Sequence, residues 1–339
     1  MNVGMLLSDV PSSVPPKQQF EDLLRIVEAA QEAGMTYIVI GQHFLYGDLR
    51  WLQPVPVLAR LAAEVDPHVR LATQIVIPNL YNPVVLAEEL ATLDIMTEGR
   101  LIAGFGLGYR MEEYDFMGVP KIRKAARMDE AIELMLKVWT EESFDFDGEF
   151  WQLEGATPHI QTWQKPHMPL WVGGHALGGA RRAGRFGAVY CVPPETTVDE
   201  ILERFAIVKE GYAARGEPFR PQSLRRNVLV AGSREEALVE YARVAKGRYI
   251  TYAEKGLDLY TGDDLEEDFE KTIAGHAVLG TPDDVVAELL DLVTTLPVDP
   301  LLVRPQWPTM DGDETVATIK TLGRDVFPAL LDVEPRTDL

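Results

Sequence analysis

The sequence predicts a single (β/α)8 barrel, and two observations carry that prediction. Short apolar runs alternate with amphipathic helical patterns about eight times along the 339 residues, and a barrel of this size is commonly one domain. In addition, residues 70–109 form a clear strand–helix–strand unit, which in proteins is right-handed and has parallel strands. A doubly wound open sheet is the alternative for the same alternation.

The ends of each element in that unit are well marked. Leu71–Ile77 is short, apolar and ended by Pro78, as expected of a buried strand. A helix then begins with Asn82 as its N-cap and Pro83 in its first turn, and its leucines are spaced to form a buried stripe. Leu101–Phe105 follows as a second apolar strand.

The remaining elements follow in chain order. Strands are predicted at Val3–Leu7, Tyr37–Ile40, Leu170–Val172, Ala188–Val192, Asn227–Ala231 and Leu301–Val303. Helices are predicted at Gln18–Ala33, Pro54–Val65, Lys121–Thr140, Ala180–Gly184, Val198–Arg215, Pro282–Thr294 and Asp313–Leu331. Ser233 and Thr281 have the positions of N-caps, which adds a helix after Ser233.

Two stretches break the alternation and are predicted to be insertions. Residues 141–168 are rich in aromatic side chains, and residues 248–280 are charged and partly helical. Long excursions in a barrel usually form lids or substrate walls, because active sites lie at the carboxyl ends of the strands. No domain boundary is predicted elsewhere, so residues 1–339 are expected to form one domain.

Composition excludes several classes of partner. The formal net charge of -21 disfavours nucleic acid and anionic membrane surfaces, which both require a basic protein surface. The single cysteine, Cys191, lies in an apolar run and is expected to be a buried structural thiol. The N-terminal residues lack a basic leader, and no segment is as long as a membrane span, so a cytoplasmic protein is expected.

Candidate functional residues are sought directly after each strand. His43 and His175 follow different strands and lack companion ligands, so no metal site is expected. The segment GGHALGG, Gly173–Gly179, follows a strand and opens a helix, where free backbone amides can bind an anion. The alternative for this segment is a tight turn without a ligand. Gly104, Gly106 and Gly108 would allow the backbone to approach another group closely.

Several segments in the same order and spacing resemble one family. They are AGMTYIVIGQHF, NPVVLAEELATLDIMTEGRLIAGFGLGYRMEEYDFMG, RMDEAIELMLKVWTEE, FDFDGEFW, QKPHMPLWVGGHALGGARRAGRFG and GTPDDVV. The chain resembles the bacterial luciferase-like flavin monooxygenases and their deazaflavin-dependent relatives, over nearly its whole length. The resemblance implies a (β/α)8 barrel with an insertion after the fourth strand, in agreement with the strand count.

The resemblance also implies a flavin site. A cis peptide between Gln74 and Ile75 would support the flavin ring, with Gly106 and Gly108 beside the cofactor. The ribityl phosphate would be held by the backbone of Gly173, Gly174, His175, Ala176 and Leu177.

Catalytic roles follow from the same resemblance. His43 would face the ring as a proton donor or acceptor, with Tyr109 or Arg304 as polar partners. Tyr109 stands where deazaflavin dehydrogenases of the family have a glutamate acid, which argues against sugar-phosphate dehydrogenation.

The function implied is oxidation of a small, largely apolar organic substrate by O2 and reduced FMN, which a partner flavin reductase would supply. The alternatives are an F420-dependent hydride-transfer oxidoreductase, a non-catalytic flavin-binding protein, and an unrelated barrel lyase or hydrolase. The resemblance implies a homodimer. The alanine and leucine stripes of the helices predicted at residues 54–65 and 83–96 place its interface there.

Overall fold

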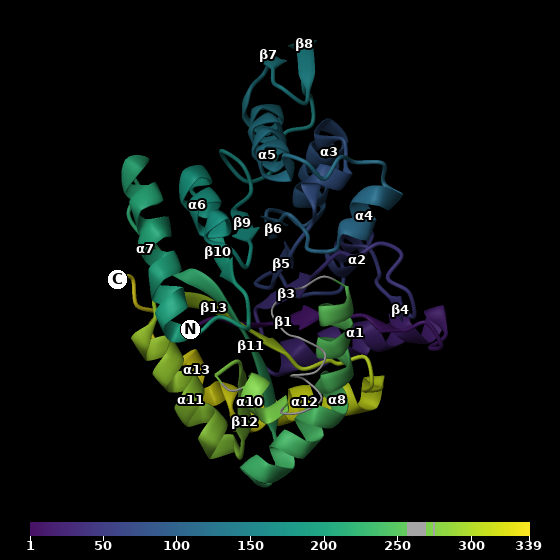
Figure 1. Cartoon of the computed structure of the whole chain (residues 1–339), viewed down its shortest axis with the longest axis vertical. Helices are drawn as coiled ribbons and strands as arrows, with labels where there is room; N and C mark the ends of the chain where they lie inside the picture. The colour runs from purple at the N-terminus through teal and green to yellow at the C-terminus, as the bar shows by residue number, and fades with distance from the viewer. Residues whose placement is uncertain (256–268, 274) are drawn as a thin grey trace.

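The computed structural model describes residues 1–255, 269–273 and 275–339, in which parallel strands close into a barrel (Figure 1). Among these residues the ring consists of β1 (Val3–Leu7), β3 (Tyr37–Ile40), β5 (Arg70–Thr73), β6 (Leu101–Phe105), β9 (Leu170–Gly173), β10 (Val189–Val192), β11 (Gln222–Val230) and β13 (Val298–Arg304). These are the eight strands that the sequence predicts, so the barrel prediction is confirmed.

Two pairings close the ring and exclude the open sheet. β1 pairs with β13, with Val3 opposite Leu301, and β10 pairs with β11, with Cys191 opposite Ser223. Cys191 is buried, as predicted. β12 (Ala277–Gly280), which the sequence analysis did not predict, pairs in parallel with the carboxyl-terminal part of β11.

Helices surround the ring and cover its apolar strands. The long ones are α1 (Pro16–Glu32), α2 (Pro54–Leu61), α3 (Pro83–Met96), α5 (Lys124–Thr140), α6 (Leu177–Phe186), α7 (Val198–Ala214), α8 (Arg234–Glu254), α11 (Pro282–Thr295) and α12 (Gly312–Asp325). Shorter ones are η1 (Pro78–Leu80), α4 (Met111–Phe116), α10 (Phe269–Ile273) and α13 (Phe327–Leu331). None of the described helices combines the length and apolar character needed to cross a bilayer.

Local signals fix most helix ends as predicted. The Asn82 side chain accepts from the Val84 amide at 2.9 Å, and Thr281 forms a reciprocal capping box with Asp284. One helix prediction is wrong: residues 313–331 are two helices, α12 and α13, which meet at Val326. Pro328 explains the break, because its ring excludes the helical carbonyl four residues earlier and it has no amide hydrogen.

The two insertions differ in their relation to the barrel. In the first, β7 (Phe144–Asp147) and β8 (Gln152–Ala156) form an antiparallel hairpin that projects beyond α5, at the top of Figure 1. Its Trp151 ring packs on the guanidinium of Arg127, 4.4 Å away, and so belongs to the α5 surface. In the second, residues 256–268 and 274 lie outside the described residues, while the end of α8 reaches the barrel mouth.

Gly104 within β6 and Gly106 directly after it allow the β6 backbone to lie unusually close to the end of β5. A Cβ on Gly104 would lie 1.9 Å from the Thr73 carbonyl oxygen, and a Cβ on Gly106 would lie 1.8 Å from Ile75 Cδ1. β5 itself ends at Thr73, earlier than the predicted Ile77, and Val76 then pairs again with Phe105. The sequence analysis predicted that these glycines let the backbone approach another group closely. In the structure, that group is the bulged segment of residues 73–77.

We expect Gly104→Ala to destabilise the fold by about 1–3 kcal/mol or more, because the backbone carbonyl of Thr73 cannot move aside as a side chain can. Gly247→Ala is the matched control, since a Cβ there meets nothing within 4 Å. The control lies inside α8 and should stabilise the protein slightly, because alanine favours helix over glycine. Urea unfolding of both variants measures the difference, and equal midpoints would contradict the role given to Gly104.

Candidate active site

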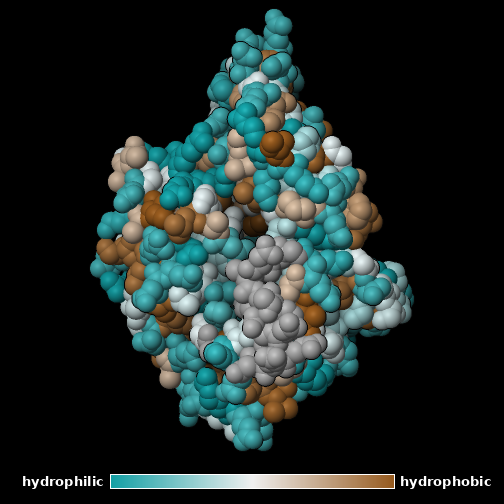
Figure 2. Space-filling model, in the orientation of Figure 1, coloured by the Kyte–Doolittle hydropathy of each residue, from teal (hydrophilic) through white to brown (hydrophobic). Residues whose placement is uncertain are grey.

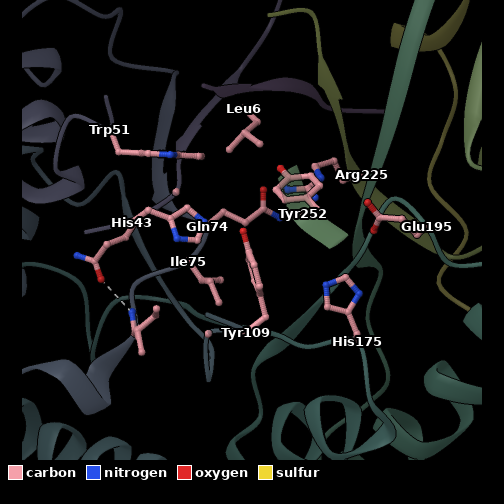
Figure 3. Close-up of a pocket in the computed structure, with 14 residues that line it drawn as sticks. Leu6, His43, Trp51, Gln74, Ile75, Tyr109, His175, Glu195, Arg225 and Tyr252 are labelled. Carbon is pink, nitrogen blue, oxygen red and sulfur yellow. Dashed lines mark hydrogen bonds between the residues drawn. The ribbon is translucent and has the colours of Figure 1, made fainter. Parts of the chain in front are cut away.

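A cavity opens at the carboxyl ends of the barrel strands, where the sequence predicts the site. Figure 2 shows the surface hollowed near the centre of this face, with hydrophobic side chains visible inside the hollow. The lining residues come from strands β1 and β11, from α8 and from the loops after β3, β5, β6, β9 and β10. They are Leu6, Gly41, Gln42, His43, Trp51, Gln74, Ile75, Ile77, Gly108, Tyr109, His175, Glu195, Arg225 and Tyr252 (Figure 3).

The cavity brings together part of the predicted site. The predicted residues that line it are His43, Gln74, Ile75, Gly108, Tyr109 and His175. The other predicted residues stand behind or beside the wall: Arg304, Gly106, Gly173, Gly174, Ala176 and Leu177. Their roles, and those of the lining residues, remain predictions.

The floor of the cavity is the bulge at the end of β5. The Gln74–Ile75 peptide is cis, which confirms the prediction made for this bond. The Gln74 amide donates to the Ile40 carbonyl at 2.8 Å, and the Val76 amide donates to the Gly104 carbonyl at 2.9 Å. The backbone on each side of the cis peptide is therefore held by a neighbouring strand, and the side chains of both residues of the peptide reach the cavity.

His43 is held by a buried carboxylate. Its Nδ1 lies 3.0 Å from Glu113 Oε1, and the Phe44 amide donates to the same oxygen at 2.7 Å. Burial lowers the pKa of His43, although the carboxylate of Glu113 opposes that shift. A neutral imidazole whose Nδ1–H donates to a carboxylate has a free, unprotonated Nε2, which is suited to accept a proton from a ligand.

Glu113 was missed by the sequence analysis. It lies in the pair Glu112–Glu113 of the short helix α4, and nothing local distinguishes the two carboxylates. Glu112 is half exposed and pairs with Arg110, whereas Glu113 has no exposed surface. Its Oε2 is buried without a hydrogen-bond partner among the described residues.

Aromatic rings enclose His43. The imidazole lies 4.8 Å from the Trp51 ring and 5.4 Å from the Tyr109 ring, measured between centroids. The Tyr109 and Tyr46 hydroxyls are 2.8 Å apart. Burial raises the pKa of Tyr109, with Tyr252 and Tyr46 adding to the effect, so its phenol stays protonated and can donate a hydrogen bond.

Arg304 does not line the cavity itself but is hydrogen-bonded to Tyr252, which does. Its guanidinium donates to the Tyr252 hydroxyl at 3.1 Å and to Ser8 Oγ at 2.6 Å. Asp9, which is fully buried, accepts from Arg248 at 3.0 Å and lies 3.6 Å from Arg304. Burial would raise the pKa of Tyr252, but the two arginines outweigh it and the pKa is lowered. The residue that reaches the cavity here is Tyr252, from α8.

The GGHALGG segment has the backbone arrangement of an anion site. The carbonyl of Gly174 accepts from the Tyr190 hydroxyl at 2.5 Å, and that of His175 accepts from Arg204 at 3.0 Å. In a trans peptide the amide points opposite to the carbonyl, so the amides of His175 and Ala176 face away from these partners. Neither they nor the amides of Leu177 and Gly178 donate to any described residue.

The first turn of α6 adds to this arrangement. α6 begins at Leu177, and its positive dipole end lies where the free amides are. Burial lowers the pKa of His175, so its side chain adds no charge. A Cβ on Gly174 would lie 3.3 Å from Gly179 Cα. This glycine therefore permits close packing of the turn on its own helix.

The described residues do not provide a set of metal ligands at the cavity. Within the described part of the chain, no group of three or more His, Cys, Asp or Glu side chains is arranged to hold a metal ion. The free amides, the unpartnered buried Oε1 of Gln74 and the aromatic walls fit a planar, phosphorylated cofactor.

Comparison with known proteins identifies the family. The model of the luciferase-like monooxygenases matches residues 1–299. The chain belongs to this family. The oxygenase component of flavin-dependent trigonelline monooxygenase from Acinetobacter baylyi is 30% identical over 230 residues, which are 66% of this chain and 62% of that protein. F420-dependent glucose-6-phosphate dehydrogenase from Gordonia bronchialis is 33% identical over 207 residues, 57% of this chain and 60% of that enzyme.

These matches span about three fifths of the relatives' own length. Among solved structures, monooxygenase RslO1 from Streptomyces bottropensis has a TM-score of 0.83 and 26% identity, covering 97% of this chain and all of that one. The oxygenating constituent of 3,6-diketocamphane monooxygenase from Pseudomonas putida, solved with FMN, has a TM-score of 0.80 at 18% identity, over 99% of this chain and 100% of that one, and so shows the fold. The family includes both FMN-dependent monooxygenases and F420-dependent oxidoreductases.

Proposed function

We propose that this chain is the oxygenase component of a flavin-dependent monooxygenase, which uses reduced FMN and O2 to oxidise a small organic substrate. The observation that carries the proposal is that one cavity is lined by the bulge at Gln74–Ile75, by His43 and by His175. His175 belongs to the turn before α6, whose backbone amides have no described acceptor. When bound, reduced FMN would supply the electrons that activate O2.

The phosphate of FMN would be held by the amides of His175, Ala176, Leu177 and Gly178. Because Tyr190 and Arg204 bind the carbonyls of this turn, the amides are already oriented before a ligand arrives. A preorganised turn loses little entropy on binding. The dipole of α6 favours the anion further.

The flavin ring would lie against Gln74 and Ile75. The amide of Gly106, which donates to the Val76 carbonyl at 3.1 Å, fixes the backbone behind this floor. Trp51, Tyr109 and Tyr252 would form the remaining walls and exclude water from the reacting groups.

Proton transfer would fall to His43. Its free Nε2 accepts a proton while Glu113 holds the Nδ1–H and stabilises the imidazolium that forms. Tyr109 would donate a hydrogen bond to an oxygen of the ligand. Arg304 is a positioning residue in this proposal, since it holds the hydroxyl of Tyr252.

A separate reductase would supply the reduced flavin. Two similar proteins are named as an oxygenase component and an oxygenating constituent, which implies a further component in those systems.

An F420-dependent hydride transfer is the second candidate. It is favoured by the F420-dependent glucose-6-phosphate dehydrogenases among the relatives. Against it stands Tyr109, a neutral phenol at the cavity wall where those enzymes are expected to have an acid.

We further propose a homodimer through α2 and α3. A groove between these helices is lined by Val55, Val85, Met96 and Ile160, of which Val85 is 53% and Met96 51% exposed. Glu88, Glu89 and Thr92 of α3 line the same groove, so its exposed apolar side chains stand beside polar ones. Alanine and leucine on α2 and α3 allow close packing with a second copy.

We expect a particle of twice the chain mass by light scattering at micromolar concentration. Replacing both Val85 and Met96 by lysine should give monomers, because it places charge in the groove. Leu45→Lys, at another exposed apolar residue, should leave the dimer intact. A monomeric wild type would refute the interface.

We expect FMN to bind at least tenfold more tightly than riboflavin, since only FMN engages the amides of the α6 turn. Titrations of FMN, riboflavin and F420 side by side, followed by fluorescence, measure this preference. Equal binding of riboflavin and FMN would remove the phosphate site. Tighter binding of F420 than of FMN would select the second candidate function.

We expect His43→Ala to lower turnover by on the order of 10²-fold, the usual effect of losing a positioned proton-transfer group. FMN affinity should change by no more than about threefold, or roughly 0.6 kcal/mol. Glu113→Gln should show a smaller loss in the same direction, because an amide cannot stabilise the imidazolium equally. His68→Ala, at an exposed histidine, serves as the control. If most of the His43→Ala protein misfolds but the soluble remainder keeps its turnover rate, His43 is a core residue and the catalytic assignment is wrong.

A further inference from the structure

One end of the cavity carries a cation, Arg225, that has no counter-ion among the described residues. Arg225 lines the cavity, and its side chain makes no hydrogen bond or ion pair with any described residue. Its Nε is buried without a partner. Arg248 and Arg304, also near the cavity, differ from Arg225 because both lie beside the carboxylate of Asp9.

The strand directs this side chain into the site. Arg225 and Arg226 are consecutive in β11, so they point to opposite faces. Arg226 is 1% exposed and donates to the carbonyls of Pro194 and Thr196 at 3.2 and 2.9 Å. Burial lowers the pKa of Arg226 to about 10. Arg226 therefore uses its guanidinium to hold the backbone, while Arg225 can bind a ligand.

Within the described part of the chain, no acidic side chain forms an ion pair with Arg225. Glu195 lines the same end of the cavity, but no ion pair joins it to Arg225, and its own Oε2 is buried without a described partner. Burial lowers the pKa of His175, so that ring is neutral. Figure 3 shows Arg225, Glu195 and His175 at one side of the cavity, opposite Trp51 and His43.

We propose that Arg225 binds a carboxylate of the substrate, and that the substrate is a small aromatic acid. This inference rests on the proposed function and deepens it. A guanidinium offers two parallel N–H donors that match a carboxylate. An uncharged ligand would instead leave this cation desolvated and unpaired, which is costly. The flat walls formed by Trp51, Tyr109 and Tyr252 suit the aromatic remainder.

Anionic oxygen could also come from the cofactor phosphate, and the experiment separates the two sources. Benzoate and benzamide, which share one shape, are titrated into the FMN-loaded protein and into the cofactor-free protein. We expect benzoate to bind at least tenfold more tightly than benzamide in both. In Arg225→Gln the preference should fall to within about twofold, with benzamide affinity unchanged as the check on folding.

Further variants sharpen the assignment. Arg225→Lys should keep part of the preference for benzoate, because lysine keeps the positive charge but lacks the two parallel N–H donors of a guanidinium. Glu195→Gln should strengthen benzoate binding, because it removes a nearby negative charge. Arg181→Gln, at an exposed arginine of α6, should leave the preference intact.

The proposal is overturned if benzoate does not outcompete benzamide in the wild type, or if the preference survives in Arg225→Gln. It is equally overturned if Arg225→Gln weakens FMN binding and leaves benzoate binding unchanged, because Arg225 then serves the cofactor. Failure of the proposed function is distinguishable: FMN would not bind, or F420 would bind more tightly than FMN, whatever the result with benzoate.

Discussion

The close approach of β6 to the end of β5 is the constraint on which the site depends. Without side chains at Gly104 and Gly106, the β6 backbone lies against residues 73–77 and accepts and donates the hydrogen bonds that those residues need. The bulge at Gln74–Ile75 is thereby fixed as the floor of the cavity. Every other group of the site, His43 and Tyr109 included, is arranged around that floor.

Charge pairing divides the cavity into two chemically different ends. At one end, the Glu113 carboxylate is hydrogen-bonded to His43, and Asp9 compensates the charges of Arg248 and Arg304. Buried charges that are paired cost less and hold their geometry. Arg225 at the other end has no such partner among the described residues. The two ends of the cavity therefore differ in chemistry: one holds a histidine bound to a carboxylate, and the other holds an arginine without a described counter-ion.

The family contains two cofactor chemistries on one barrel, and this chain shares the backbone features that both would use. In the proposed site, the amides of the α6 turn would bind a phosphate whatever ring is attached to it, because backbone groups do not contact the ring. Side chains of the cavity wall would then have to select between the two cofactors. Tyr109, a protonated phenol in contact with Tyr46, is one such wall residue.

The sequence by itself determined the eight ring strands, the helix caps at Asn82 and Thr281, and the location of His43, His175 and the glycines at the strand ends. These features depend on local periodicity and on backbone limits, which a single segment carries. Two local predictions failed. β5 ends early because the backbone bulges at Gln74–Ile75 before Val76 pairs with Phe105, and Pro328 divides the predicted last helix. Only the tertiary structure decided which charges are paired. Glu113 meets His43 across 70 positions, Arg304 lies behind Tyr252, and Arg225 is left without a described partner while adjacent Arg226 is satisfied. Residue type and spacing do not fix these outcomes, because a counter-ion is found through the packing of segments that are far apart in the chain.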